Sequence, residues 1–372
     1  MINKQTVLLV LTNIVWIAGL YLYTKPALRF SQFSKKKQRN VLFLILVFCI
    51  FSFWGNDWFN YLDYYHDITI GYGKYVPIEK IYLSIADISS NYIIFRLIIW
   101  GMGLFLFYKT INRLAINRDI VLFFFCTIFL IWFSYARVSL AIAMLCYGYS
   151  LLYNDGNKVG VKNKIIGISL ILLSFFFHKS AVFGVVAVIL SMIIRNMKRS
   201  GAVIVLLSFP LMVFFMIVVF PDLFGQLLEN GDSTAGQYAA AGNRYMNASE
   251  MVRGIGTTIQ LLLEHIPYYL LAFGCAKAIM YKRQDIPNSV MPFLYLTLVL
   301  VVFSSVFLFN VGMNTYIIYQ RFLRFAQIAA CISLTVLYQY GYFPKLVKWT
   351  YSIWFFSTAY SLIYVMYNVY VG

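Results

Sequence analysis

The residues best suited to chemistry in this sequence are arginines at the edges of long apolar stretches. Arg137 comes four residues after the stretch Val121–Phe133, and Arg321 and Arg324 stand three residues apart, on one face of a helix that contains both. A charge at membrane depth is costly and usually faces a cavity or a partner, although an arginine also extends its head group to the membrane surface. Because a planar guanidinium binds two phosphate oxygens at once, these arginines predict a site for a phosphate or pyrophosphate group.

A histidine in a second short turn is suited to proton transfer. His178 lies in the sequence Phe177-His178-Lys179-Ser180-Ala181, between two apolar stretches. Near neutral pH an imidazole takes a proton from a hydroxyl or, when charged, holds a phosphate. A lone histidine at a helix end is equally consistent with a structural hydrogen-bonding role. We interpret His178 as the proton acceptor or as a group that orients the acceptor of the reaction.

An acidic and aromatic segment follows the second apolar stretch. Asp57, Tyr61 and Tyr64 fall at helical spacing, as do Asp63 and Asp67, and this pattern predicts an amphipathic helix at the membrane surface. Tyrosines at that level also need no function beyond an aromatic belt. We expect Asp57 to assist the histidine or to bind a sugar hydroxyl, and Asp63 and Tyr64 to bind substrate. Three aspartates can hold a metal ion, but no metal-ligand motif is evident, and we expect neither a metal nor another cofactor.

The longest polar connection covers residues 221–257 and is rich in Gly, Ala, Asn and Ser. A loop of this length between packed elements is usually either functional or disordered. It carries Arg244, Tyr245 and Arg253, and Glu264 and His265 follow at the start of the next apolar stretch. We assign Arg244, Tyr245, Arg253 and Glu264 to the binding of a pyrophosphate or a glycan. The loops 55–90 and 221–257 together are expected to form the candidate active-site face.

About twelve apolar stretches run from one end of the chain to the other, and they define its class. The stretch Ala202–Phe220 approaches the length of about 20 residues that spans a hydrocarbon core, and shorter stretches such as Val41–Trp54 must borrow polar flanks. The mean hydropathy of +0.76 and the 12% of charged residues exclude a soluble globular protein. We predict an all-α polytopic integral membrane protein with about twelve transmembrane helices in a single domain, residues 1–372. Its five cysteines lie inside apolar stretches and are expected to be buried and free.

The charged residues sort onto alternate connections between these stretches. The six connections after the odd-numbered stretches carry 20 of the 30 Lys and Arg but only three of the 13 Asp and Glu. By the positive-inside rule these six connections are cytoplasmic, and both termini are then non-cytoplasmic. The net charge of +17 reflects this topology and contact with anionic membrane lipid, so that no nucleic acid is expected as a partner.

Five short patterns share an order and a spacing that point to one protein family. They are Gly55-Asn56-Asp57 followed by Tyr61 and Tyr64, Pro77-Ile78-Glu79 with Tyr82, Arg137 followed by Leu140-Ala141, Phe177-His178-Lys179-Ser180-Ala181, and Arg321 through Phe325. With these patterns the chain resembles, over most of its length, the EpsG-type exopolysaccharide polymerases, a Wzy-like group of bacterial sugar polymerases. The arginine turn and the histidine hairpin are the most specific pair.

The resemblance implies a GT-C-like, membrane-embedded glycosyltransferase in the bacterial inner (plasma) membrane, with its active site on the non-cytoplasmic side. Such a polymerase builds an O-antigen, a capsule or an exopolysaccharide. It transfers the growing glycan from undecaprenyl pyrophosphate to the next lipid-linked repeat unit. The implied partners are this lipid-linked oligosaccharide and a chain-length regulator protein.

Three other classes of protein remain open at this point. A ligase of the O-antigen type would use the same donor and the same distribution of charge. A membrane acyltransferase would also need a histidine in the membrane, but with a cytoplasmic acyl donor. A lipid or solute transporter would be expected to show a site on broken helices at the midplane and a repeat between its halves, and the sequence displays neither.

Overall fold

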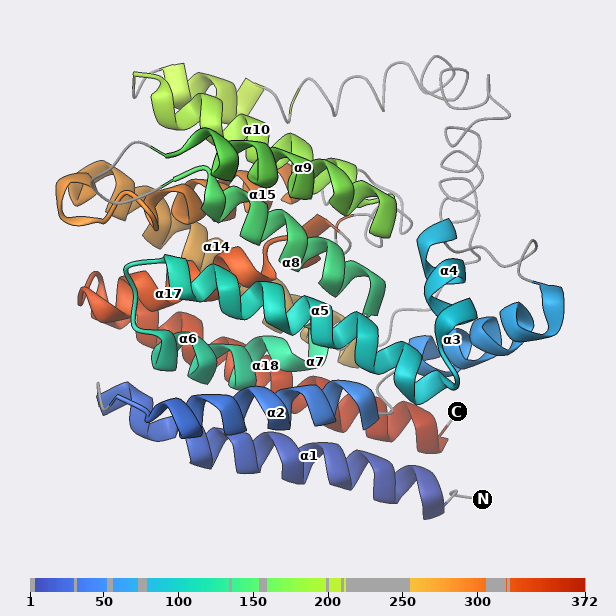
Figure 1. The fold of residues 1–372 in the computed structure, drawn as a ribbon. Coiled ribbons are helices and arrows are strands. Elements are labelled where there is room, and N and C mark those ends of the chain that lie inside the picture. Colours follow the sequence, from blue (N-terminus) through green and yellow to red (C-terminus); the bar gives the residue numbers. More distant parts are fainter. Residues whose placement is uncertain are drawn as a thin grey trace.

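The computed structural model describes residues 4–29, 32–51, 56–72, 79–133, 136–153, 159–198, 201–208, 211, 255–305, 319 and 322–371. Within these ranges the chain forms helices and turns and no β-strand, which confirms the predicted all-α class. Long helices lie side by side and run back and forth between the two ends of the molecule (Figure 1).

The helices have the following bounds. The long ones are α1 (Lys4–Thr24), α2 (Lys35–Phe51), α5 (Tyr92–Arg113), α8 (Ala136–Leu151), α9 (Val161–Phe177), α10 (Ala181–Asn196), α14 (Ile255–Tyr281), α15 (Met291–Ser305), α17 (Gln327–Gln339) and α18 (Pro344–Val371). The shorter ones are η1 (Lys25–Arg29), α3 (Asn56–Asp67), η2 (Ile68–Tyr72), α4 (Lys80–Ile88), α6 (Arg118–Phe124), η4 (Phe125–Phe129), α7 (Leu130–Phe133) and η5 (Arg283–Asp285).

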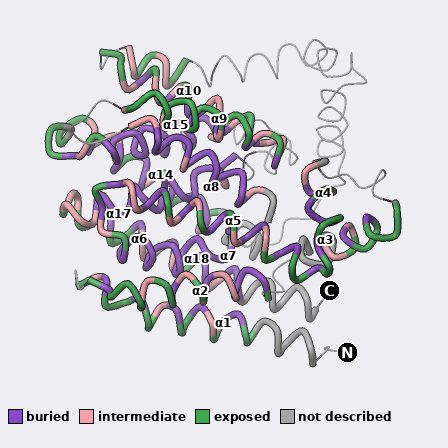
Figure 2. Tube along the Cα trace, viewed as in Figure 1, coloured by how far each residue is buried: buried purple, intermediate pink, exposed green. Residues whose placement is uncertain are grey.

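The most deeply buried part of the bundle is the continuous helical run α6–η4–α7. It packs against α1, α17 and α18, and its residues from Asp119 to Ile131 are all buried (Figure 2). From Ile120 onward, Thr127 is the one polar residue among these buried positions, as expected of a helix with neighbours all around it. The ring of Phe125 stacks on that of Phe107 in α5, with centroids 4.4 Å apart. All five cysteines are buried and free, as predicted from their positions in apolar stretches.

Asparagine side chains cap the start of two helices, α5 and α6. Asn91 caps α5 by accepting a hydrogen bond from the backbone N–H of Ile94, at 2.9 Å. Asn117 caps α6 in the same way, and its side chain accepts from the backbone N–H groups of Asp119 and Ile120. Such caps satisfy N–H groups that have no partner inside the helix.

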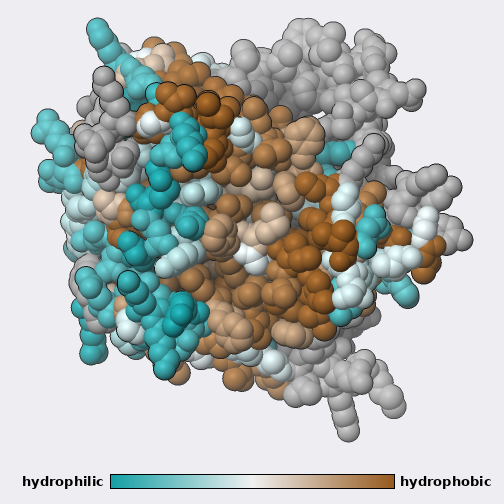
Figure 3. Space-filling view, viewed as in Figure 1, coloured by the Kyte–Doolittle hydropathy of each residue, from teal (hydrophilic) through white to brown (hydrophobic). Residues whose placement is uncertain are grey.

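The surface divides into an apolar band and a hydrophilic end. Figure 3 shows hydrophobic side chains across the middle of the molecule and hydrophilic ones gathered at the end where η1 and the adjoining end of α2 lie. The C-terminal ends of α1, α5 and α8 lie at this end, and the start of α1 and the end of α18 lie at the other (Figure 1). The helices that precede three of the six basic connections therefore end on the same side of the bundle.

One described helix, α5, is long and apolar enough to cross a membrane by length and composition. Four shorter apolar helices cover Val138–Leu151, Ala181–Asn196, Met291–Ser305 and Gln327–Gln339. The count of about twelve spans, the GT-C-like fold and the side of each terminus stay predictions.

The acidic segment after α2 forms helix α3, as its spacing predicted. It continues into the π-helical turn η2, where Gly71 has a φ of 92° that only glycine adopts without strain. The Tyr65 hydroxyl donates to the carbonyl of Ser89 at 2.8 Å, and its ring packs against Tyr92 at the start of α5. These contacts hold α3 and α4 beside the end of the bundle opposite the basic connections (Figure 1).

Candidate functional site

The histidine hairpin is joined to the acidic segment by a contact between side chains 99 residues apart. Helix α9 ends at Phe177, and His178 leaves it in an extended conformation before α10 begins at Ala181. The His178 Nδ1 lies 3.2 Å from Oε1 of Glu79, at the N-terminus of α4. The backbone N–H of Lys179 donates to the same oxygen, also at 3.2 Å. The carboxylate thus holds two consecutive residues of the hairpin.

Local packing explains why α4 reaches the end of α9. Tyr82 stands one turn after Glu79 and is buried, and its ring meets the ring of Phe177 edge-on, with centroids 6.1 Å apart. The side chains of His178 and Glu79 are 12% and 9% exposed. They are shielded enough to strengthen an ionic hydrogen bond and still border the surface.

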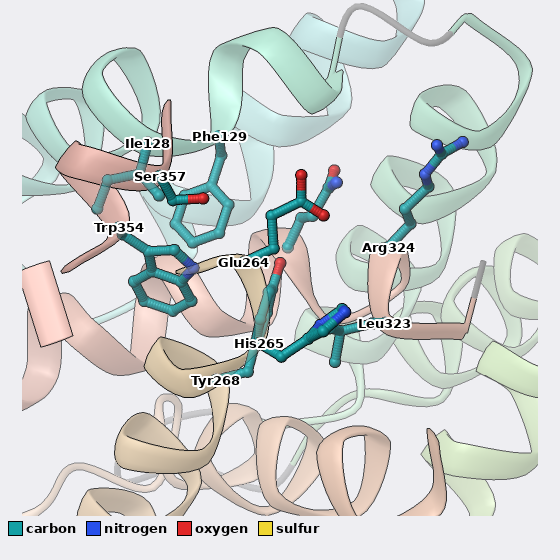
Figure 4. Close-up of a pocket in the computed structure, with 10 residues that line it drawn as sticks. Ile128, Phe129, Glu264, His265, Tyr268, Leu323, Arg324, Trp354 and Ser357 are labelled. Carbon is teal, nitrogen blue, oxygen red and sulfur yellow. The ribbon is translucent and has the colours of Figure 1, made fainter. Parts of the chain in front are cut away.

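A second cluster surrounds a small cavity between α14, α17, α18 and the buried run α6–η4–α7. It is lined by Ile128, Phe129, Glu264, His265, Tyr268, Leu323, Arg324, Gln327, Trp354 and Ser357 (Figure 4). Its volume of about 40 Å³ has room for water molecules but not for a sugar ring. Two residues assigned to substrate binding from the sequence, Glu264 and Arg324, therefore line one cavity.

The cavity combines an aromatic wall with charged groups. Trp354 meets Phe129 and Tyr268 edge-on, with centroids 5.2 and 4.9 Å apart. Glu264 is buried and accepts a hydrogen bond from Oγ of Ser361 at 3.4 Å. In Figure 4, Glu264 stands between Trp354 on one side and Arg324 on the other.

Helix α14 has a proline beside this cavity. Pro267 lacks an N–H, so it makes no hydrogen bond to the carbonyl one turn earlier in the helix. His265, two residues before it, is buried, and its ring meets that of Tyr319 with centroids 4.4 Å apart. The polar side chains of this turn thus lie where the helix's own hydrogen bonding is weakened.

An aromatic contact connects the two clusters. Phe183, on the first turn of α10, packs on Phe322, with ring centroids 3.8 Å apart. Phe183 follows the histidine hairpin directly, and Phe322 precedes Arg324 by two residues. The hairpin and the arginine segment are therefore neighbours in the fold.

Two side chains donate to the last backbone carbonyl of α7, four residues before Arg137. The carbonyl of Phe133 accepts a hydrogen bond from Oγ of Ser139 at 2.5 Å and one from the indole N–H of Trp100 at 3.4 Å. Arg137 itself is the second residue of α8, and its side chain lies outside the part that the structure describes.

The remaining predicted residues have varied outcomes. Asp63 is exposed on α3, Tyr64 is half-buried there, and neither lines the cavity. Asp57 belongs to α3, but its side chain is outside the described part. Arg244, Tyr245, Arg253 and Arg321 also lie outside the described residues.

Sequence reasoning missed several residues that the structure places in these clusters. Glu79 belongs to Pro77-Ile78-Glu79, one of the five short patterns of the family resemblance, and His178 belongs to another. This shared resemblance is the one signal in the sequence that connects the two residues. Tyr268, Gln327 and Trp354 sit inside apolar stretches, where they read as packing residues. Among the described residues, no three His, Cys, Asp or Glu side chains gather as a metal site would require.

The architecture and the two clusters define an all-helical, strongly apolar protein with arginine, glutamate and histidine side chains near one end of its bundle. The family model described as the EpsG family matches residues 17–372, nearly the whole chain. This chain belongs to the EpsG family. No curated protein and no solved structure matches it.

Proposed function

We propose that this protein is a membrane-embedded polymerase of a bacterial surface polysaccharide. The observation that carries the proposal is membership of the EpsG family over residues 17–372, which suggests a polysaccharide polymerase-like role. The neighbouring histidine hairpin and arginine-bearing cavity support it, because the reaction needs both a proton acceptor and a stabiliser of a phosphate leaving group.

The proposed donor is a glycan linked to undecaprenyl pyrophosphate, and the acceptor is the next lipid-linked repeat unit. The acceptor hydroxyl gives its proton to the base as its oxygen forms a bond to the anomeric carbon of the donor. The bond from that carbon to the pyrophosphate oxygen breaks, and its electron pair stays on the oxygen. Undecaprenyl pyrophosphate leaves, and the glycan is longer by one repeat unit.

The roles of the site residues are part of the proposal. His178 accepts the proton, and Asp57 binds a sugar hydroxyl nearby. Arg324 stabilises charge on the leaving pyrophosphate, and Arg137 and Arg321 act with it. A guanidinium suits this task because its donors match the spacing of phosphate oxygens.

The proposed location is the inner membrane, with the site on the non-cytoplasmic side. Reporter fusions after Lys36 and Lys162 should then report the cytoplasm, and a fusion at Gly372 the outer face. A cytoplasmic signal at Gly372 would contradict the topology without touching the chemistry.

The test of function uses purified protein with a synthetic undecaprenyl-pyrophosphate-linked repeat unit. We expect a ladder of products that differ by one repeat unit, with release of undecaprenyl pyrophosphate. Arg324→Ala should make the ladder much shorter and fainter at an unchanged protein level. Arg39→Ala is the matched control, because Arg39 is exposed on α2 near the basic end. Transfer of the unit to a foreign acceptor without lengthening would identify a ligase instead.

A further inference from the structure

The contact between His178 and Glu79 constrains which ring nitrogen faces the substrate. An ionised carboxylate can only accept hydrogen bonds, so Nδ1 of His178 must be the donor in the 3.2 Å contact with Glu79 Oε1. In a neutral imidazole with a proton on Nδ1, the other nitrogen, Nε2, is the acceptor. In this tautomer, the lone pair that can take a proton is the one on Nε2.

A second hydrogen bond fixes where the carboxylate stands. The backbone N–H of Lys179 donates to the same Oε1 at 3.2 Å. Two donors on one carboxylate oxygen stabilise the ionised form of the carboxyl group. The backbone of Glu79 is itself fixed, because its carbonyl accepts from the N–H of Tyr82 at 2.9 Å at the first turn of α4. Tyr82 in turn packs on Phe177, the residue before the histidine. Both partners are therefore held by the same packed junction of α4 and α9.

We propose that Glu79 is a positioning residue for the transfer reaction. Its carboxylate holds His178 with the proton on Nδ1, so that Nε2 faces the acceptor hydroxyl and takes its proton. This inference rests on the proposed function, and it leaves Asp57 in the role of binding a sugar hydroxyl. The logic is that of an acid–imidazole–hydroxyl relay, in which the carboxylate orients the ring and stabilises the imidazolium that forms.

A structural role for Glu79 would predict different behaviour. If the carboxylate only tied α4 to the hairpin, Glu79→Gln would lower stability and leave the rate of the folded fraction unchanged. If it orients the ring, Glu79→Gln lowers kcat, because the amide can donate to Nδ1 and thereby favour the wrong tautomer. Among the described residues, the carboxylate of Glu79 from α4 contacts the ring, and Lys179 follows His178 in the hairpin. Removing the carboxylate removes a charge that favours the imidazolium.

The kinetic test compares purified Glu79→Gln, Glu79→Asp and the parental enzyme on the synthetic lipid-linked repeat unit. For Glu79→Gln we expect kcat to fall by about 100-fold, within the range that positioned proton transfer contributes, at a nearly unchanged KM. The acid limb of the pH–kcat profile should also move to lower pH. Glu79→Asp keeps the charge and should recover part of the rate. The matched control is Asp87→Asn, which removes an exposed carboxylate from the same helix α4 and should change nothing.

Two further measurements separate this inference from the proposed function. The double variant Glu79→Gln with His178→Gln should be no slower than His178→Gln alone, because groups that act as one unit are not additive. The nitrogen chemical shifts of His178 in ¹⁵N-histidine-labelled protein, assigned by their loss in His178→Gln, should show the proton on Nδ1 when the ring is neutral. That spectrum is independent of turnover.

The outcomes divide as follows. The role of Glu79 is overturned if the neutral ring of His178 carries its proton on Nε2 in the unmodified protein. It is also overturned if Glu79→Gln has the same kcat and pH profile as the unmodified protein. In either case, a product ladder from the unmodified protein would still support the polymerase. Absence of any ladder from the parental enzyme, with the Nδ1 proton present, overturns the polymerase and leaves the pairing. Loss of stability in Glu79→Gln with an unchanged kcat assigns the residue to structure alone and also overturns the inference.

Discussion

Gly148 and Gly167 bring α8 and α9 into backbone contact. A Cβ placed on Gly148 would lie 2.6 Å from the carbonyl oxygen of Gly167, and one on Gly167 would lie 2.7 Å from that of Gly148. Neither distance is tolerated by a real side chain, and the obstructing atoms belong to backbone. Helix pairs in membranes use small residues for such close approach. The same helix α9 ends at the histidine hairpin, so this contact sets where the hairpin stands.

We therefore expect Gly167→Ala to lower stability and polymer yield together. Overpacking of a tight contact costs about 1–3 kcal/mol, more than the about 1 kcal/mol that alanine gains over glycine within a helix. Thermal unfolding in detergent measures the change. Gly101→Ala is the control, because no atom lies within 4 Å of its added Cβ, and it should be neutral or stabilising. Equal melting temperatures for the two variants would show that α8 and α9 can separate without cost.

Arg96 is a buried cation whose hydrogen bonds hold the end of α2. Its Nη2 donates to the carbonyl of Cys49 at 2.6 Å and its Nη1 to the hydroxyl of Tyr92 at 3.2 Å. The guanidinium also lies over the ring of Trp100, 4.4 Å from its centroid. A lysine cannot supply this planar fork. We expect Arg96→Lys to cost about 2–3 kcal/mol, since hydrogen bonds to a charged group are worth about that much.

Unfolding by heat or denaturant tests the prediction for Arg96. The exposed Arg118 at the start of α6 gives the control substitution Arg118→Lys, which should leave the midpoint unchanged. A midpoint for Arg96→Lys within error of the parental value would mean that an ammonium group satisfies the same partners.

Glu264 and Arg324 line one cavity but carry opposite charges, and this predicts opposite effects on donor binding. Removal of the guanidinium in Arg324→Ala should raise KM for the pyrophosphate donor and lower kcat. Removal of the negative charge in Glu264→Gln should leave that KM equal or lower, because a carboxylate repels phosphate oxygens. KM measured for the donor at fixed acceptor concentration decides the matter. A higher donor KM in both variants would place the pyrophosphate away from Arg324.

The parts of this structure that follow local rules are those predicted from the sequence. Apolar stretches such as Val121–Phe133 became helical because a helix satisfies its own backbone, and the basic connections converged because charge avoids the apolar band. Glu264 and Arg324 were assigned to substrate binding, and they share a cavity because both stretches begin at the same end of the bundle. The alternation of basic connections along the sequence indicates which stretches begin at the same end of the bundle.

Contacts across the chain could not be predicted in the same way. Glu79 and His178 are 99 residues apart, and nothing in their spacing indicates the packing of Tyr82 on Phe177 that brings them together. Trp354 gave no signal either, because a tryptophan in an apolar helix is expected to face lipid or core as often as a cavity. Periodicity identifies a helix and which of its faces is apolar, but it does not identify the neighbouring helix.

The contact of Phe183 with Phe322 joins the histidine hairpin to the segment that carries Arg324. Their ring centroids are 3.8 Å apart, and Phe303 packs on Phe322 from another side, at 5.5 Å. Truncation to alanine would cost about 3–5 kcal/mol and risks unfolding. Phe322→Leu preserves an apolar side chain but loses the tilted contact between the two rings, and we expect it to lower kcat several-fold with a smaller loss of stability. Phe176→Leu is the matched control, because Phe176 is 61% exposed on α9.

If the proton acceptor and the arginine must stand at a fixed separation, Phe183→Leu should cause the same loss, and the double variant should add little to either. Independent, additive losses would mean that the two clusters act without this contact, and the alignment of base and leaving group would then have to come from elsewhere in the fold.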